Sequence, residues 1–578
     1  MTDNHIFIVA GQIIMIDQHS QNRLQRLQWR FVVGWAILSL AFVAWGLVKM
    51  TIDRTPTAMA GRANLDALMP WWVASTMAWV ALSIMAWMLW RGIVRTRRES
   101  YGTVVMLILV VAIGARVAVL IGHEPTLSDD VYRYVMDGRN LAHGHNPYLD
   151  TPAERAGFPS DVILERPLSV LMGEIDALSI EERWSGEADL LPLINNPELH
   201  TIYLPTSQWV FAGTGLLIRE NMSDPSNSTW MFRSVMVGFE VLAILLLIGA
   251  LILRKQSPWW AALYAWHPLP LAELAGSGHQ DSIGLAFMML AMVLFLIAPR
   301  KIWGWTICLA LAALVKPVVL PIAAFMLKDL SVRRFHHREH GEARDGKQKT
   351  ENLKTEMREG DQFSFDSSHL RDSPWCILLS SLQNWKAWLL SVVIGALVCL
   401  AISAPLWFTH DGKPLDNLRE TSTRFSTKWS HFGSVYESSL WAIRLVDPLE
   451  DPDLQWQKKD RQELQARGIC LALVGIVCVI AFFCPAGVWR SSRAVLFAMV
   501  LFSSTSHPWY LLWALILLPV AFSPAVWVAS LTLLLGYAQL GDVVEWETPT
   551  WVMWLAYVPI FVVLILDLAR KVFFRHPT

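Results

Sequence analysis

An apolar run and a dense polar cluster lie close together at residues 101–139. Residues 101–121 read YGTVVMLILVVAIGARVAVLI, and residues 128–139 read SDDVYRYVMDGR. A run of roughly 20 apolar residues is long enough to cross a bilayer as a helix. A polar cluster at the end of such a span is a candidate functional site, because ions are costly near hydrocarbon. The pattern predicts a membrane helix that delivers Asp129 and Asp130 to a membrane surface.

The composition of the whole chain predicts many such helices. The 578 residues are 54% hydrophobic and only 17% charged, and they include 30 Trp, a residue enriched where membrane meets water. The formal net charge is -1, and no basic stripe indicates nucleic-acid binding. The six Cys have no spacing typical of a disulfide framework or a zinc site. We therefore expect a polytopic membrane protein with neither a disulfide framework nor a zinc site.

Positive charges at the ends of the apolar runs predict their orientation, since Lys and Arg favour the cytoplasmic side. Arg91 follows the second run, and Arg254 with Lys255 follows the run at 231–253. The span at 101–121 therefore begins in the cytoplasm, and the span at 231–253 ends there. Residues 122–230, which connect them, are predicted to form one large external loop. Within that loop, the interrupted apolar stretch 203–218 is predicted to be re-entrant or interfacial.

The whole chain is predicted to be an all-α polytopic protein with about 14 membrane helices and both termini in the cytoplasm. Two of these helices are half-helices at 303–327 that meet near Lys316 and Pro317, because proline breaks a helix. The other predicted spans are 31–50, 71–90, 101–121, 231–253, 258–275, 282–298, 385–408, 468–483, 494–506, 511–522, 524–540 and 551–568.

These spans divide the chain into four parts. Residues 1–100 are a cytoplasmic segment and a two-span hairpin, and residues 101–327 are a core membrane module. Residues 328–373 are a charged cytoplasmic loop. Residues 374–578 are a C-terminal membrane module with an external loop at 409–467.

Five polar clusters fall on the predicted outer face. Lys316 ends an apolar run, so we expect it to need an anionic partner, and a lipid phosphate is a natural candidate. The clusters are Asp129 and Asp130 with Arg133, Asp137 and Arg139; His279 with Asp281; Lys316; Arg424 with Lys428, Trp429 and His431; and His507 with Tyr510.

The order of these motifs resembles that of the bacterial GT-C superfamily of glycosyltransferases. The motifs are residues 128–148, NPELHTIY at 196–203, GHQD at 278–281, LVKP at 314–317 and HPWY at 507–510. Enzymes of this superfamily are polytopic and use polyprenyl-phosphate sugars. The branch that this chain resembles most is the polyprenyl-phosphomannose-dependent mannosyltransferases. The resemblance covers most of the chain from Tyr101 onward, and it implies a GT-C-like fold with a catalytic first external loop.

The resemblance implies transfer of a hexose from a lipid-linked polyprenyl-phosphate donor to a glycan or glycolipid acceptor. Mannose is the first candidate for that hexose. The active site would face outward from an inner or plasma membrane, and no cofactor besides the donor substrate is assigned. Asp129 best matches the general base, with Asp130 second because the acids are adjacent. The donor-phosphate candidates are Lys316, Arg133, Arg139 and His279, and the substrate-binding candidates are Tyr132, Asp137, Asp281, Tyr203, His507 and Tyr510.

The chain departs from the superfamily pattern in two places. It carries an acidic insertion at 150–189, and its first two spans, before Tyr101, are an addition to the usual core. Neither feature receives a role from the resemblance.

Simple chemistry agrees with the assigned roles. A sugar hydroxyl is a poor nucleophile, so a carboxylate must take its proton as the new bond forms. A fixed cation stabilises the charge that grows on the departing phosphate. A single displacement would invert the anomeric centre.

Other interpretations of the same residues stay open. Asp129, Arg133 and Asp137 have the spacing of ordinary helix-surface ion pairs. His279 and Asp281 suit a polar turn, and residues 507–510 suit an aromatic membrane anchor. The break at Lys316 and Pro317 also suits a transporter or flippase of a lipid-linked sugar, although such proteins place polar groups along a path through the bilayer.

Overall fold

The computed structural model describes residues 5–9, 12–16, 18–53, 58–93, 100–122, 124–155, 190–218, 225–332, 374–450, 455–542 and 548–573. The predicted acidic insertion beyond residue 155 and the predicted charged loop beyond residue 332 lie outside the described residues. The described chain is helical apart from loops and one short hairpin. In that hairpin β1 (His5–Val9) pairs antiparallel with β2 (Gln12–Ile16), with His5 opposite Ile16.

Eight of the described helical segments are long and apolar enough to cross a membrane, so the chain is a membrane-embedded helical protein. α13 (Asp281–Ile297) and α14 (Ile302–Ala313) are shorter apolar helices. The eight segments are α1 (Gln18–Lys49), α2 (Ala58–Trp90), α3 (Tyr101–Gly122), α10 (Pro225–Leu253), α17 (Trp385–Trp407), α20 (Trp456–Phe483), α23 (Pro524–Thr532) continued by η8 (Leu533–Gly541), and α24 (Thr550–Phe573).

Two predicted spans are not continuous helices. Residues 258–276 form four short pieces, because Pro268 and Pro270 lack the backbone N–H that a continuing helix needs. Residues 508–520 form a short helical stretch that ends in turns. The pieces are η3 (Pro258–Ala261), α11 (Ala262–Ala265), α12 (Pro268–Pro270) and η4 (Leu271–Gly276) in the first segment, and η7 (Pro508–Leu511) with α22 (Leu512–Leu515) in the second.

The predicted break at Pro317 is confirmed. α14 ends at Ala313, Lys316 is extended, and η5 (Pro317–Val319) leads into helical residues that continue to 332. Further elements are η2 (Leu191–Leu193), α16 (Pro374–Gln383), η6 (His410–Gly412), α19 (Ser434–Val446) and α21 (Val488–Leu501).

Two buried arginines bind carbonyls of the broken segment 258–276. Arg116 of α3 donates to the Ala265 carbonyl at 2.9 Å and pairs with Glu240 of α10. Arg233 of α10 donates to the Ala275 carbonyl at 3.0 and 2.8 Å. Backbone groups without partners are costly inside a membrane protein, so these contacts let the chain break within an apolar region.

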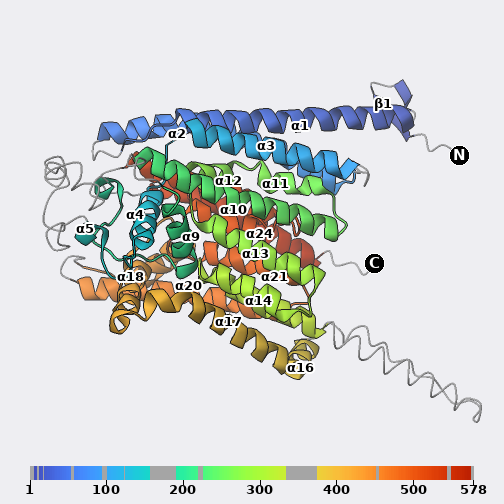
Figure 1. The fold of residues 1–578 in the computed structure, drawn as a ribbon. Coiled ribbons are helices and arrows are strands. Elements are labelled where there is room, and N and C mark those ends of the chain that lie inside the picture. The colour runs from blue at the N-terminus through green and yellow to red at the C-terminus, as the bar shows by residue number, and fades with distance from the viewer. Residues whose placement is uncertain are drawn as a thin grey trace, which may run out of the picture.

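A close approach between helices sets the position of α4 (Asp130–Ala142). A Cβ atom on Gly138 of α4 would lie 2.5 Å from the Phe211 carbonyl of α9 (Pro205–Gly215). A Cβ atom on Gly215 would meet the Gly138 carbonyl at 2.6 Å, so both positions require glycine. α9 is the stretch expected to be re-entrant or interfacial, and it is a short helix packed on α4. Together with α5 (Pro152–Arg155) and α18 (Lys413–Lys428), these helices lie at one end of the helical body, with β1 at the other (Figure 1).

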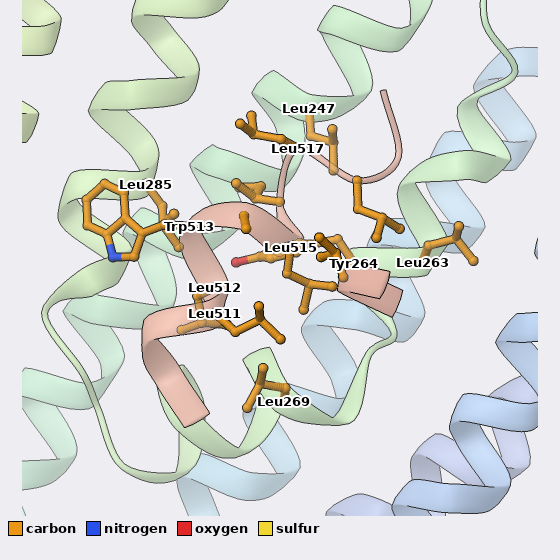
Figure 2. Packing of buried hydrophobic residues seen from close by; sticks show 14 of the residues in the cluster. Leu247, Leu263, Tyr264, Leu269, Leu285, Leu511, Leu512, Trp513, Leu515 and Leu517 are labelled. Carbon is orange, nitrogen blue, oxygen red and sulfur yellow. The ribbon is translucent and has the colours of Figure 1, made fainter. Parts of the chain in front are cut away.

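Residues 511–517 pack into the largest hydrophobic core. Figure 2 shows Trp513 beside Leu285 of α13, with neighbouring leucines around Leu515. A Cβ atom on Gly284 would lie 2.2 Å from the Trp513 ring, so glycine makes room for the indole. This packing brings η7 next to the turn before α13.

The helical hairpin formed by α1 and α2 shares this core with the C-terminal helices. α1 packs on α2, and α2 packs on η8. Asn64 donates to the Leu540 carbonyl at 3.0 Å, and Trp72 donates to the Leu534 carbonyl at 3.1 Å. The first two helices are therefore built into the body of the protein.

Candidate functional site

Charged side chains from four separate segments meet between α4 and the turn before α13. Burial and ion pairing are unusual for so many charges in an apolar protein, which makes this the candidate site. The residues are Asp130 in the first turn of α4, Glu273 in η4, His279 and Asp281 around the start of α13, and Lys316 between α14 and η5.

His279 lies between two carboxylates. Its Nδ1 is 3.5 Å from Oδ2 of Asp130, and its Nε2 is 3.3 Å from Oε2 of Glu273. The His279 and Glu273 side chains are fully buried, whereas the Asp130 side chain is 32% exposed. Trp509 stacks on the imidazole with ring centroids 4.2 Å apart. A ring that faces an acid at each nitrogen suits the doubly protonated imidazolium.

The electrostatics of this arrangement favour charged forms. Burial by itself would lower the pKa of His279, but Asp130 and Glu273 together raise that pKa from 6.5 to about 9. Burial would likewise raise the pKa of Asp130, but His279, with help from Lys316 and Tyr203, lowers it below its ordinary value. At neutral pH the site holds a carboxylate next to a histidine cation.

Lys316 forms the second ion pair of the site. Its Nζ is 2.9 Å from Oδ1 of Asp281, which also accepts a hydrogen bond from the Trp513 indole. The same Nζ lies 4.1 Å from the centre of the Tyr510 ring. The Lys316 side chain is 23% exposed, so this cation can still reach an anionic ligand.

Aromatic rings connect the site to the loop before α19. His507 stacks on Trp509 at 4.2 Å, and His431 stacks on His507 at 4.7 Å. Burial, aided by the nearby histidines and Lys316, lowers the pKa of His507 well below 6.5. His507 is therefore neutral while His279 is charged. On the other side, Tyr203 packs edge-on against Tyr134 at 4.8 Å.

The structure brings many of the predicted residues together. This site contains seven of them: Asp130, Tyr203, His279, Asp281, Lys316, His507 and Tyr510. Asp129 is the N-cap residue of α4, one position before the acid that pairs with His279.

Other predicted residues have partners within the protein fold. Arg133 donates to Asp137 at 2.9 Å, and Asp137 also accepts from Gln208 at 2.8 Å. Arg139 donates to Ser228. Tyr132 is half-buried against a small core around Val131, and Lys428 pairs with Asp460 on the surface. The predictions for Arg133 and Arg139 as phosphate ligands thus concern guanidinium groups that already bind protein side chains.

Sequence analysis missed three residues of the site. Glu273 had a recognisable signal, because it is an acid inside the apolar run 258–275, and such acids are functional candidates. Tyr537 donates a hydrogen bond to Glu273, and Trp513 donates one to Asp281. Neither aromatic residue stands out in its own apolar segment.

Among the residues that the structure describes, no group of three or more His, Cys, Asp or Glu side chains is arranged to hold a metal ion. The chemistry available to the site is that of a partly exposed carboxylate, a partly exposed ammonium and a buried imidazolium. Comparison of the chain with known protein families, with curated proteins and with solved structures found no match.

Proposed function

We propose that this chain is a GT-C-like membrane glycosyltransferase with about 14 membrane helices. It transfers a hexose, with mannose as the first candidate, from a polyprenyl phosphate to a cell-envelope glycan or glycolipid on the outer face. Both termini lie in the cytoplasm. The observation that carries the proposal is the presence of Asp130 and Lys316, both partly exposed, in one site. An inverting transfer needs these two opposite charges, one for the nucleophile and one for the leaving group.

In this mechanism Asp130 is the general base. Its carboxylate is ionised at neutral pH because its pKa is lowered by His279. It takes the proton of the acceptor hydroxyl while the hydroxyl oxygen bonds to the anomeric carbon. The bond from that carbon to the phosphate oxygen breaks, and the phosphate leaves with the electron pair. Lys316 neutralises the negative charge that develops on the phosphate.

The choice of Asp130 over its neighbour revises the first choice made from the sequence. Asp130 pairs with His279 and is influenced by Lys316, so it belongs to the charged site. Asp129, the N-cap residue of α4, remains the second candidate. The two adjacent acids provide a matched pair of variants, because each can be changed to Asn with the same loss of charge.

The test is a transfer assay on purified protein in detergent. Radiolabelled polyprenyl-phosphate hexoses are supplied with a native glycolipid extract. We expect Asp130→Asn to lower the rate roughly 10²- to 10⁴-fold, as for loss of a general base, and Asp129→Asn to retain most of it. The reverse ranking would make Asp129 the base. Folded wild-type protein that gives no product with any hexose donor would contradict the proposed function.

A lipid-linked sugar transporter or flippase is the second candidate. It is favoured by the helix breaks at 258–276 and at Lys316, since discontinuous helices often line transport sites. Proteoliposomes loaded with a labelled lipid-linked sugar separate the two candidates. Movement of the sugar between leaflets without a new glycosidic product would favour the transporter.

A further inference from the structure

Glu273 and Tyr537 form a buried extension of the proposed active site. The Tyr537 hydroxyl donates to Oε1 of Glu273, and Oε2 of Glu273 lies 3.3 Å from His279. The side chain of Glu273 is fully buried and Tyr537 is nearly so, which places both beyond direct contact with a substrate. Their effect on the reaction would therefore pass through His279.

We propose that Glu273, held by Tyr537, is a positioning residue that keeps the His279 ring charged and turned toward Asp130. This inference depends on the proposed function for its catalytic meaning. Its physical content, a histidine cation fixed between two acids, can be measured without any transfer reaction.

The geometry of the imidazole supports this role. Each ring nitrogen faces a different carboxylate, and Trp509 covers a face of the ring. Loss of the Glu273 charge would leave the buried Nε2 proton without the acid that it faces. The ring would then more readily lose that proton, and Asp130 would no longer have a cationic partner.

Helix α2 supports the arrangement from behind. Trp71 of α2 packs edge-on against the Tyr537 ring, with centroids 5.9 Å apart. Asn64 and Trp72 of the same helix bind backbone carbonyls of η8 on either side of Tyr537, at Leu540 and Leu534. The α1–α2 hairpin, which has no role in the resemblance, thus packs on η8, the element that carries Tyr537.

Several charged or titratable groups lie on the elements around His279. Two of them, Asp130 and Glu273, are in ion-pair contact with the imidazole. The groups are Asp130 on α4, Glu273 on η4 with Tyr537 of η8 behind it, Asp281 on α13, Lys316 before η5, and His507 before η7.

The test measures the protonation of His279 in full-length protein labelled with ¹⁵N-histidine. The His279 signal is assigned by its loss in His279→Gln, and it is followed by NMR from pH 6 to 10 in wild type and in Glu273→Gln. We expect the wild-type midpoint to lie near 9 and the Glu273→Gln midpoint to fall by about one pH unit or more, as for loss of a neighbouring charge. The pH at which the transfer rate falls to half on the alkaline side should decrease by the same amount.

Tyr537→Phe tests the same series of contacts, from Tyr537 through Glu273 to His279, without changing any charge. It keeps the ring on Trp71, removes the hydrogen bond to Glu273, and should give a smaller shift in the same direction. Tyr557→Phe is the matched control, because the Tyr557 hydroxyl donates to the Phe432 carbonyl instead. It should leave the His279 midpoint unchanged.

The outcomes separate this inference from the proposed function. An unchanged His279 midpoint in Glu273→Gln overturns the positioning role, even if that variant loses transfer. A wild-type midpoint near 6.5 also overturns it. A shifted midpoint in a protein that transfers no hexose would uphold the coupling of Glu273 to His279 while contradicting the glycosyltransferase function.

Discussion

Two ion pairs in this protein each join a basic side chain to an acidic one but differ in their exposure to solvent. Arg116 and Glu240 join α3 to α10, and both side chains are 0% exposed. Lys316 and Asp281 join the break after α14 to the start of α13, and the Lys316 side chain is 23% exposed. Arg116 also donates to the carbonyls of Ala112 and Ala265, which leaves that pair enclosed by protein.

This difference in exposure distinguishes a pair that holds the fold from a pair that can act on a ligand. The Arg116–Glu240 pair is sealed among helices and supports a broken segment, so removal of either charge strands the other in an apolar region. The Lys316 side chain is partly exposed to solvent, and in the proposed mechanism it binds the donor phosphate. We therefore expect substitutions at the first pair to reduce stability and substitutions at the second to reduce activity.

Arg116→Met should have the largest effect on the fold. It leaves the Glu240 carboxylate buried without its partner, and such changes cost about 3–5 kcal/mol in the free energy of unfolding. Thermal unfolding in detergent, followed by the loss of monodisperse protein, measures this change. The double variant Arg116→Met with Glu240→Leu should recover part of the loss, and a single variant as stable as wild type would show that the sealed pair is dispensable.

Lys316→Met should instead have its main effect on transfer. The loss of one preorganised charge at a leaving group lowers rates by roughly 10²- to 10³-fold. The free energy of unfolding should fall by about 1–3 kcal/mol, less than for Arg116→Met, because water can reach Asp281 when the lysine is gone. Lys316→Arg, which keeps the charge, should retain more activity. Equal activity in Lys316→Met and wild type would remove Lys316 from the mechanism.

High pH should weaken the site by a smaller amount. The pKa of His279 is raised from 6.5 to about 9 in the folded protein, so its stabilising charge is fully present below about 6.5 and is lost as the pH rises through about 9. The transfer rate and the unfolding temperature should both decline across this range. In His279→Gln the decline in rate at this pH should disappear, and its persistence would assign it to another group.

Asp460→Asn should have the smallest effect. Asp460 pairs with Lys428 at 2.7 Å, but the two side chains are 42% and 56% exposed. Exposed pairs contribute roughly 0–1 kcal/mol, so the unfolding temperature should change little, and less at high salt. A loss as large as that of Lys316→Met would mean that exposure does not separate the classes of ion pair in this protein.

The long spans were predictable because hydropathy is a local property. Residues 101–122 and 385–407 are helices where apolar runs predicted them. The segments expected as spans at 258–275 and 511–522 are not continuous helices, for a different reason. Mean hydropathy does not register where the backbone breaks, and in the first case the prolines within the run were the overlooked signal.

The candidate site was predictable only in part. Motif order pointed to the turn with His279 and Asp281 and to Lys316, and the structure brings both close to α4. The pair of Arg133 with Asp137 follows from their four-residue spacing on one helix, whereas the hydrogen bond from Arg139 to Ser228 depends on how α4 packs.

The sequence alone established a membrane-embedded helical chain with its polar motifs next to apolar runs, because both properties depend on neighbouring residues. The choice of Asp130 as the acid that pairs with His279 required the tertiary structure. So did the hydrogen bond from Tyr537 to Glu273, which joins residues 264 positions apart. Contacts over such separations depend on how helices pack in three dimensions, and no local pattern in the chain encodes them.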